Sequence, residues 1–95
     1  MKHKPWNVFF HELVGLRARV LRHLNPRLVG LEGDIVWETS RTILLRVGSR
    51  EIKILKHEAV FEIELPGGER VVVPGDSILG DPAERTKRLR KGRRR

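Results

Sequence analysis

The segment TILLRVGSREIKIL, residues 42–55, consists of two apolar-rich runs joined by Gly48 and Ser49. In the second run, residues 50–55, polar and apolar side chains alternate, which is the pattern of a β-strand with one buried face. The first run is rich in β-branched and other apolar residues, and a pair containing Gly is typical of a tight turn. The segment therefore predicts an antiparallel hairpin of two strands.

Similar patterns lie on both sides of this hairpin. Further strands are predicted at residues 16–21, 31–38, 59–65 and 69–74. Turn-forming residues separate them, as in Asn25-Pro26 and in residues 66–68. Six short strands in series favour a small antiparallel barrel, because closing a sheet removes its exposed edges. We expect an all-β fold, an SH3-like or Sm-like barrel of about six strands.

Helix signals flank the predicted barrel. Asn7 is a suitable N-cap for a short helix that runs to Val14, and its apolar side chains recur at helical spacing. Near the other end, Asp81 can cap a helix that begins at Pro82, and Glu84 can complete a capping box. We therefore expect three parts: a basic and apolar N-terminal arm with a short helix at residues 1–15, the barrel at residues 16–80, and a C-terminal helix running into a basic tail at residues 81–95.

Two features of the predicted strand at residues 31–38 bear on function. Trp37 is expected to share the core face with Ile35, so packing in the core is favoured over stacking on a base. The acidic side chains of this strand are expected on the opposite face, namely Glu32, Asp34 and Glu38. Three carboxylates could collect Mg²⁺, but alternating acids more often mark only the solvent side of a strand, so no metal site is assigned.

The charge is concentrated at the ends of the chain. The formal net charge is +8, and residues 85–95 carry eight Lys and Arg residues without one acid. Residues 24–80, by contrast, carry seven Lys and Arg against nine Asp and Glu. Arg is more abundant than Lys, and its planar guanidinium pairs bidentately with phosphate. This distribution favours a polyanionic partner, with nucleic acid as the first choice and an anionic membrane surface as the second.

Several kinds of chemistry are not supported by the residues present. The chain has no Cys, and its four His residues do not show the spacing of a zinc site. It has no phosphate-binding loop, no nucleophile elbow and no apolar run of the ~20 residues that cross a bilayer. Aromatic residues make up only 5% of the chain, so RNA would be recognised through arginines on its backbone. We expect a soluble, cytoplasmic binding protein that is not catalytic alone.

Four segments resemble one known family in consistent order. They are HELVGL at residues 11–16, NPRLVGLEGDIVWET at 25–39, AVFEIELP at 59–66, and Gly75 with Leu79-Gly80-Asp81-Pro82 and Arg85 further along. Together they are similar to archaeal ribonuclease P protein component 1 over about residues 8 to 88. The resemblance implies an Sm-like barrel and a subunit of the ribonucleoprotein that removes the 5′ leader of precursor tRNA.

The resemblance also implies partners and cofactors. The chain would bind and organise the ribonuclease P RNA, which would perform the hydrolysis with its own Mg²⁺ ions, so this chain itself would bind no cofactor. It would meet precursor tRNA only indirectly and would not bind a membrane. Sm-like barrels can form rings, but basic arms of like sign would crowd in a ring, so we expect a monomer in isolation. It would also pair with the zinc-ribbon subunit of the same enzyme and meet other subunits of the complex. The residues expected to contact that zinc-ribbon subunit are Phe9, Phe10, Leu13, Ile35 and Trp37.

The positive surface expected to meet RNA combines the first strand with the C-terminal helix. Its residues are Arg17, Arg19, Arg22, Arg85, Lys87, Arg88, Arg90 and Lys91. Two alternatives remain open. One is a ribosomal protein of the KOW type, which would use the same barrel and tails on ribosomal RNA. The other is a stand-alone nuclease that would use His11, His23 and the acids of residues 31–38.

Overall fold

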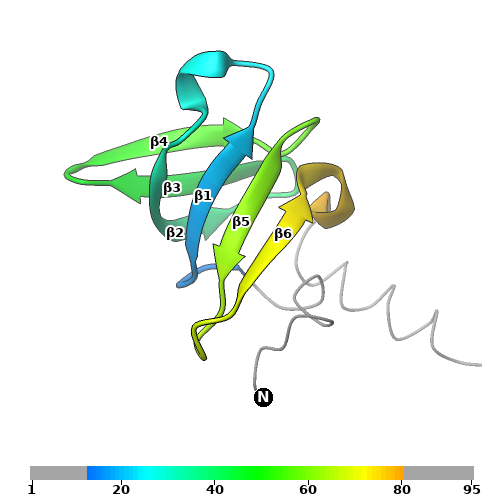
Figure 1. Ribbon diagram of the computed structural model, residues 1–95. Helices are drawn as coiled ribbons and strands as arrows, with labels where there is room; N and C mark the ends of the chain where they lie inside the picture. The colour runs from blue at the N-terminus through cyan, green and yellow to red at the C-terminus, as the bar shows by residue number, and fades with distance from the viewer. Residues whose placement is uncertain (1–12, 81–95) are drawn as a thin grey trace, which may run out of the picture.

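A computed structural model describes residues 13–80 of the chain. Its strands are β1 (Arg17–Arg22), β2 (Glu32–Glu38), β3 (Thr42–Val47), β4 (Arg50–Leu55), β5 (Val60–Glu64) and β6 (Arg70–Pro74). Two short 3₁₀ helices, η2 (Pro26–Leu28) and η3 (Gly75–Ile78), complete the described part (Figure 1). The six predicted strands are therefore confirmed. The predicted terminal helices lie outside the described residues, apart from Leu13 and Val14, which lead into a turn.

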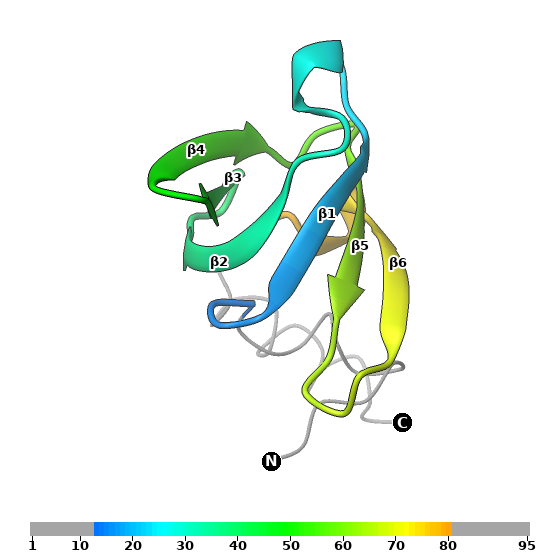
Figure 2. The ribbon, with the colours of Figure 1, turned by 60° about the vertical axis from the view of Figure 1, so that its left-hand side comes forward.

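All six strands belong to one antiparallel sheet in the order β4-β3-β2-β1-β5-β6. The sheet curls strongly, as Figure 2 shows, but it is not closed, because β4 and β6 do not pair with each other. The prediction of a closed barrel was therefore wrong. β6 ends at Pro74, which has no N–H to donate, and the chain turns directly into η3 instead of continuing along β4.

The concave side of the curled sheet holds the hydrophobic core. The alternation of β1, β3 and β5 places every second side chain on this side, as expected for strands with one buried face. The buried apolar residues are Leu13, Leu16, Ala18, Val20, Ile35, Ile43, Leu45, Ile54, Ala59, Phe61, Ile63, Leu65, Val73 and Ile78. Full burial of one large apolar side chain contributes about 1.5–3 kcal/mol, so this cluster is the main source of stability.

A β-bulge in β2 changes which side chains face the core. Ile35 pairs with Leu45, whereas Trp37 pairs with Leu44, so β2 carries one extra residue at this point. Ile35 is 1% exposed, but Trp37 is 62% exposed and Glu38 is only 7% exposed. The prediction that Trp37 packs in the core was therefore wrong, and so was the placement of Glu38 on the solvent face. The bulge shifts the alternation by one residue.

Glu38 is buried because it meets a buried lysine. The side chain of Lys56, which directly follows β4, is fully buried, and its Nζ donates to Glu38 Oε2 at 2.8 Å. The same Nζ donates to the carbonyl oxygens of Thr39 at 2.8 Å, Ser40 at 3.3 Å and Ile78 at 2.8 Å. Lys56 thus joins the end of β2, the β2–β3 turn and η3.

Candidate nucleic-acid interface

The outer face of the sheet carries a row of alternating charges that crosses all six strands. In the cross-strand register its members are Glu51, Arg46, Asp34, Arg17, Glu64 and Arg70, from β4 to β6. The sign of the charge changes at every strand. A shorter row beside it consists of Glu32, Arg19 and Glu62. We call these two sets the charge rows, and each arginine in them has at least one carboxylate directly opposite.

Arg17 shows how fully these cations are compensated. Its Nε donates to Glu32 Oε2 at 3.1 Å, and its NH1 donates to Asp34 Oδ1 at 3.3 Å. The hydrogen bond to Glu32 is the main reason why the pKa of Arg17 is raised above its ordinary value, and the charges of both acids act in the same direction. Further along the row, Arg46 NH2 lies 3.1 Å from Glu51 Oε2. A phosphate approaching Arg17 would have to displace two carboxylates.

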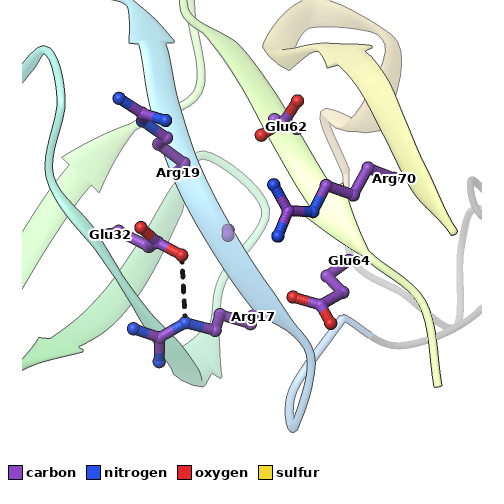
Figure 3. Close-up of a pocket in the computed structure, with 7 residues that line it drawn as sticks. Arg17, Arg19, Glu32, Glu62, Glu64 and Arg70 are labelled. Atoms are coloured by element: carbon purple, nitrogen blue, oxygen red, sulfur yellow. Dashed lines mark hydrogen bonds and ion pairs between the residues drawn. The ribbon is translucent and has the colours of Figure 1, made fainter. Parts of the chain in front are cut away.

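The hollow on this face is lined by equal numbers of positively and negatively charged side chains. Its lining residues are Arg17, Ala18, Arg19, Glu32, Glu62, Glu64 and Arg70. Figure 3 shows that the guanidinium of Arg70 reaches from β6 toward β1, between Glu62 and Glu64. Three arginines against three glutamates give the hollow no net charge, so it offers no electrostatic attraction for a single anion.

Arg22, at the end of β1, has different surroundings. A bulge at Leu21 shifts the register, so that Arg22 lies opposite the uncharged Val60 of β5. The pairing of β1 with β2 ends earlier along the strand, at Arg19 and Glu32. Within residues 13–80, Arg22 is exposed and forms no ion pair. It is the only one of the three predicted RNA-binding arginines in this range without an acid opposite.

The structure thus places the predicted RNA-binding residues in two settings. Arg17 and Arg19 lie together within the charge rows, and Arg22 lies apart from both, beyond the bulge. The remaining five, Arg85, Lys87, Arg88, Arg90 and Lys91, lie outside the described residues. The RNA-binding assignment of all eight stays a prediction. The acids opposite Arg17 and Arg19 were missed from sequence, because only the strand register shows which side chains face each other.

The predicted protein-contact residues are also divided. Leu13 and Ile35 are buried in the core, whereas Trp37 is exposed on the outer face of β2. In the register, Leu44 of β3 and Lys53 of β4 continue the row that begins at Trp37. Phe9 and Phe10 lie outside the described residues. Partner contact by these five residues stays a prediction, with Trp37 as the described member that a partner could reach.

The described residues do not assemble the site of a stand-alone nuclease. His23 Nδ1 accepts from the backbone N–H of Asn25 at 2.9 Å, and its Nε2 lies 3.1 Å from the carbonyl oxygen of Leu55. The acids of β2 are engaged by Arg17 and Lys56. Within residues 13–80, no group of three or more His, Asp or Glu side chains could hold a metal ion. His11, the other histidine of that alternative, lies outside this range.

No helix of the described part is long and apolar enough to span a membrane.

Comparison with known proteins adds a family. The family model described as "Ribonuclease P/MRP, subunit p29" matches residues 6–88. Ribonuclease P protein component 1 of Hyperthermus butylicus is 48% identical over 90 residues, which cover 94% of this chain and 81% of that protein. Its counterpart in Staphylothermus marinus is 40% identical, covering 94% of this chain and 98% of that protein.

A solved structure agrees in fold and in sequence. It is that of Mth11, a homologue of the human RNase P protein Rpp29, with a TM-score of 0.60 and 36% identity. The aligned part covers 78% of this chain and 96% of that chain. The resemblance found in the sequence is thereby confirmed. The chain belongs to the ribonuclease P/MRP subunit p29 family and is a protein subunit of ribonuclease P, the RNA-based endoribonuclease of tRNA processing.

Proposed function

We propose that this subunit binds the ribonuclease P RNA and organises it, and that the RNA, with its Mg²⁺ ions, removes the 5′ leader of precursor tRNA. The distribution of charge carries this proposal. Residues 13–80 have ten Lys and Arg against nine Asp and Glu, whereas residues 81–95 have eight against two. A near-neutral body with a strongly basic end suits docking on a dense array of phosphates. It does not suit the binding of one small anionic substrate.

In this proposal, the C-terminal cations and Arg22 supply the phosphate contacts. Arg17 and Arg19 would join them only if the RNA displaced the acids of the charge rows. The subunit meets precursor tRNA through the RNA subunit and acts in the cytoplasm, and it binds no cofactor of its own. In isolation it is a monomer, because basic ends of like sign would repel each other in a ring.

Reconstitution tests this function. The ribonuclease P RNA is transcribed and assayed for cleavage of precursor tRNA over a series of Mg²⁺ concentrations, with and without the purified chain. We expect the chain to bind this RNA and to lower the Mg²⁺ concentration needed for cleavage, because its cations replace part of the counterion atmosphere. An RNA whose folding and cleavage do not respond to the chain would contradict the proposal. Cleavage by the chain alone, free of RNA, would support the nuclease alternative instead.

We further propose that the zinc-ribbon subunit of the enzyme docks on the outer face of β2 around Trp37. The exposed indole, with Leu44 and Lys53 beside it in the register, supports a protein contact, because aromatic anchors dominate such interfaces. Sedimentation of the two purified subunits measures their association. Trp37→Ala should weaken this association about 10- to 100-fold, as expected for the loss of an aromatic anchor that the partner buries on binding.

Val72→Ala is the matched control for this interface. Val72 is 57% exposed on β6, at the far side of the sheet from β2. Its replacement should leave the association unchanged. Equal weakening by both substitutions, or by neither, would contradict docking at Trp37.

A further inference from the structure

The loop between β1 and β2 carries two exposed cations within a stretch of the chain that has no acidic residue. We use the name β1–β2 loop for residues 23–29 together with Arg22, the last residue of β1; this segment contains Arg27 and the 3₁₀ helix η2. The sequence contains no Asp or Glu from Leu13 to Leu31. Both arginines are exposed, and within residues 13–80 neither forms an ion pair. In Figure 1 the loop projects from the sheet beyond the end of β1.

The strand register explains why compensation stops here. Arg17 lies between Asp34 and Glu64, and Arg19 lies between Glu32 and Glu62. The neighbour of Arg22 on β5 is Val60, and β2 has no residue paired with it. The two charge rows therefore end before the loop begins. In this register no carboxylate lies directly opposite Arg22, whereas Arg17 has one on each neighbouring strand.

Hydrogen bonds hold the loop in one shape. Asn25 Oδ1 accepts from the backbone N–H of Arg27 at 3.0 Å, and the backbone N–H of Asn25 donates to His23 Nδ1 at 2.9 Å. Because Nδ1 is an acceptor, the hydrogen of a neutral His23 lies on Nε2 and donates to the carbonyl oxygen of Leu55 at 3.1 Å. Gly30 N–H also donates to the Val20 carbonyl at 2.8 Å. A preorganised loop loses little backbone entropy when it binds.

We propose that the β1–β2 loop is a second RNA contact, in which Arg22 and Arg27 bind backbone phosphates of the ribonuclease P RNA. This inference rests on the proposed function and deepens it. The described chain ends just after η3, away from the loop, so the loop and the basic residues 81–95 start from different places on the molecule (Figure 1). Two separated contacts on one RNA raise the affinity beyond that of either alone. Leu24, 64% exposed between the two arginines, would lie close to the RNA.

The first test measures the salt dependence of binding. The full-length chain and its R22A/R27A variant are titrated with a transcript of the ribonuclease P RNA at several salt concentrations. Loss of two phosphate contacts should reduce the log–log slope by about two units and the affinity about 10- to 50-fold near 0.1 M salt. The control, R46A/R70A, removes the same charge from the charge rows. It should change the slope by less than about one unit.

A second test locates the loop on the RNA. The chain has no Cys, so Leu24→Cys and Val72→Cys each create a single attachment point for a reagent that cleaves nearby RNA. Attachment at residue 24 should produce strong, localised cuts in the RNA, and attachment at residue 72 on β6 should not. Both positions are exposed, so neither change should disturb the fold. This readout does not depend on how the arginine variants fold.

The outcomes separate the inference from the proposed function. If the wild-type chain binds the RNA and R22A/R27A binds it equally well, the loop contact is wrong and the proposed function stands. Equal losses in the loop variant and in R46A/R70A would also overturn the inference, because they would reflect net charge alone. A loop variant that binds RNA normally but loses association with another protein subunit would assign the loop to that subunit. A wild-type chain that does not bind the RNA overturns both proposals.

Discussion

At the scale of single residues, two glycines are required for reasons of space and not of backbone conformation. Neither Gly33 nor Gly75 has a positive φ, yet a Cβ on Gly33 would collide with the carbonyl oxygen of Arg46 on β3. A Cβ on Gly75 would collide with the carbonyl oxygen of Lys56. Both obstacles are backbone atoms, which cannot move aside as the tip of a side chain can. Both positions therefore exclude every other residue type without a local rearrangement.

We predict that Gly33→Ala and Gly75→Ala each lower the free energy of unfolding by about 2–3 kcal/mol or more, as overpacking against rigid neighbours does. Gly67→Ala is the control, because its Cβ would meet only the flexible carboxylate of Glu69. That change should alter stability by no more than about 0.5 kcal/mol. Urea denaturation of the three variants measures the differences. A Gly33→Ala protein as stable as the wild type would show that β2 and β3 are not this close.

Glu58, in contrast to the two glycines, is strained by its backbone conformation and not by a lack of space. It is the one non-glycine residue in residues 13–80 with a positive φ, 55°, a conformation that costs a residue with a Cβ roughly 1–2 kcal/mol. Glu58→Gly removes this strain. It also raises the conformational entropy of the unfolded chain and removes an exposed contact to His57, so the free energy of unfolding should rise by at most about 1 kcal/mol. Thermal unfolding checks the sign. Glu69→Gly, at a position with negative φ, should be neutral or destabilising, and a loss of stability in Glu58→Gly would contradict the strain argument.

At the scale of elements, Lys56 is the point where β2, β4 and η3 are joined. Within residues 13–80 its Nζ donates to four oxygen atoms, and among these only the oxygen of Glu38 carries a charge. Lys56→Met leaves a buried carboxylate and three carbonyl oxygens without this donor, so we predict a loss of about 3–5 kcal/mol in the free energy of unfolding. Glu38→Gln keeps an oxygen acceptor for Nζ and should cost clearly less. Urea denaturation of the full-length variants measures both effects.

The double variant K56M/E38Q distinguishes an ion pair from a wider network. If the pair alone mattered, removing both charges would restore much of the lost stability, because no buried charge would remain unpaired. The carbonyl oxygen of Ile78, whose bond to Nζ is buried, and the partly buried carbonyl oxygen of Thr39 still lose the Lys56 donor in the double variant. We therefore expect it to stay within about 1 kcal/mol of K56M, since these carbonyl oxygens still lose the hydrogen bonds that Lys56 donates. Recovery to wild-type stability would contradict the network.

Lys56 also shows how far the sequence could predict the elements. All six strands followed from local alternation and turn residues, because these depend on neighbours in the chain. The bulge in β2 has no such local mark, so the exposure of Trp37 and the burial of Glu38 were missed together. Lys56 meets Glu38 from 18 positions away, and lysine is ordinarily exposed. The open edge between β4 and β6 likewise depends on contacts distant in sequence.

At the scale of the whole molecule, the sequence located the excess charge but not its compensation. The composition placed the cations at the chain ends and the near-neutral stretch between them, and both follow from counting residues. That Arg17 and Arg19 face carboxylates on two neighbouring strands, and Arg22 does not, needs the register of three strands and a bulge. The resulting molecule is electrically balanced over its sheet and unbalanced at the β1–β2 loop and in residues 81–95.

This balance predicts that salt will affect folding and RNA binding very differently. The charge rows are exposed ion pairs, which add little to stability in water, and their attractions and repulsions are screened together. Raising the salt from about 0.05 to 0.5 M should therefore change the unfolding free energy, measured in urea, by no more than about 1 kcal/mol. Over the same range, affinity for the ribonuclease P RNA should fall with a log–log slope of roughly −4 to −5 if about six phosphates are contacted. If the unfolding free energy fell with salt as steeply as the RNA affinity, the charge rows would stabilise the sheet more than exposed ion pairs can. An RNA affinity that does not change with salt would contradict docking on phosphates.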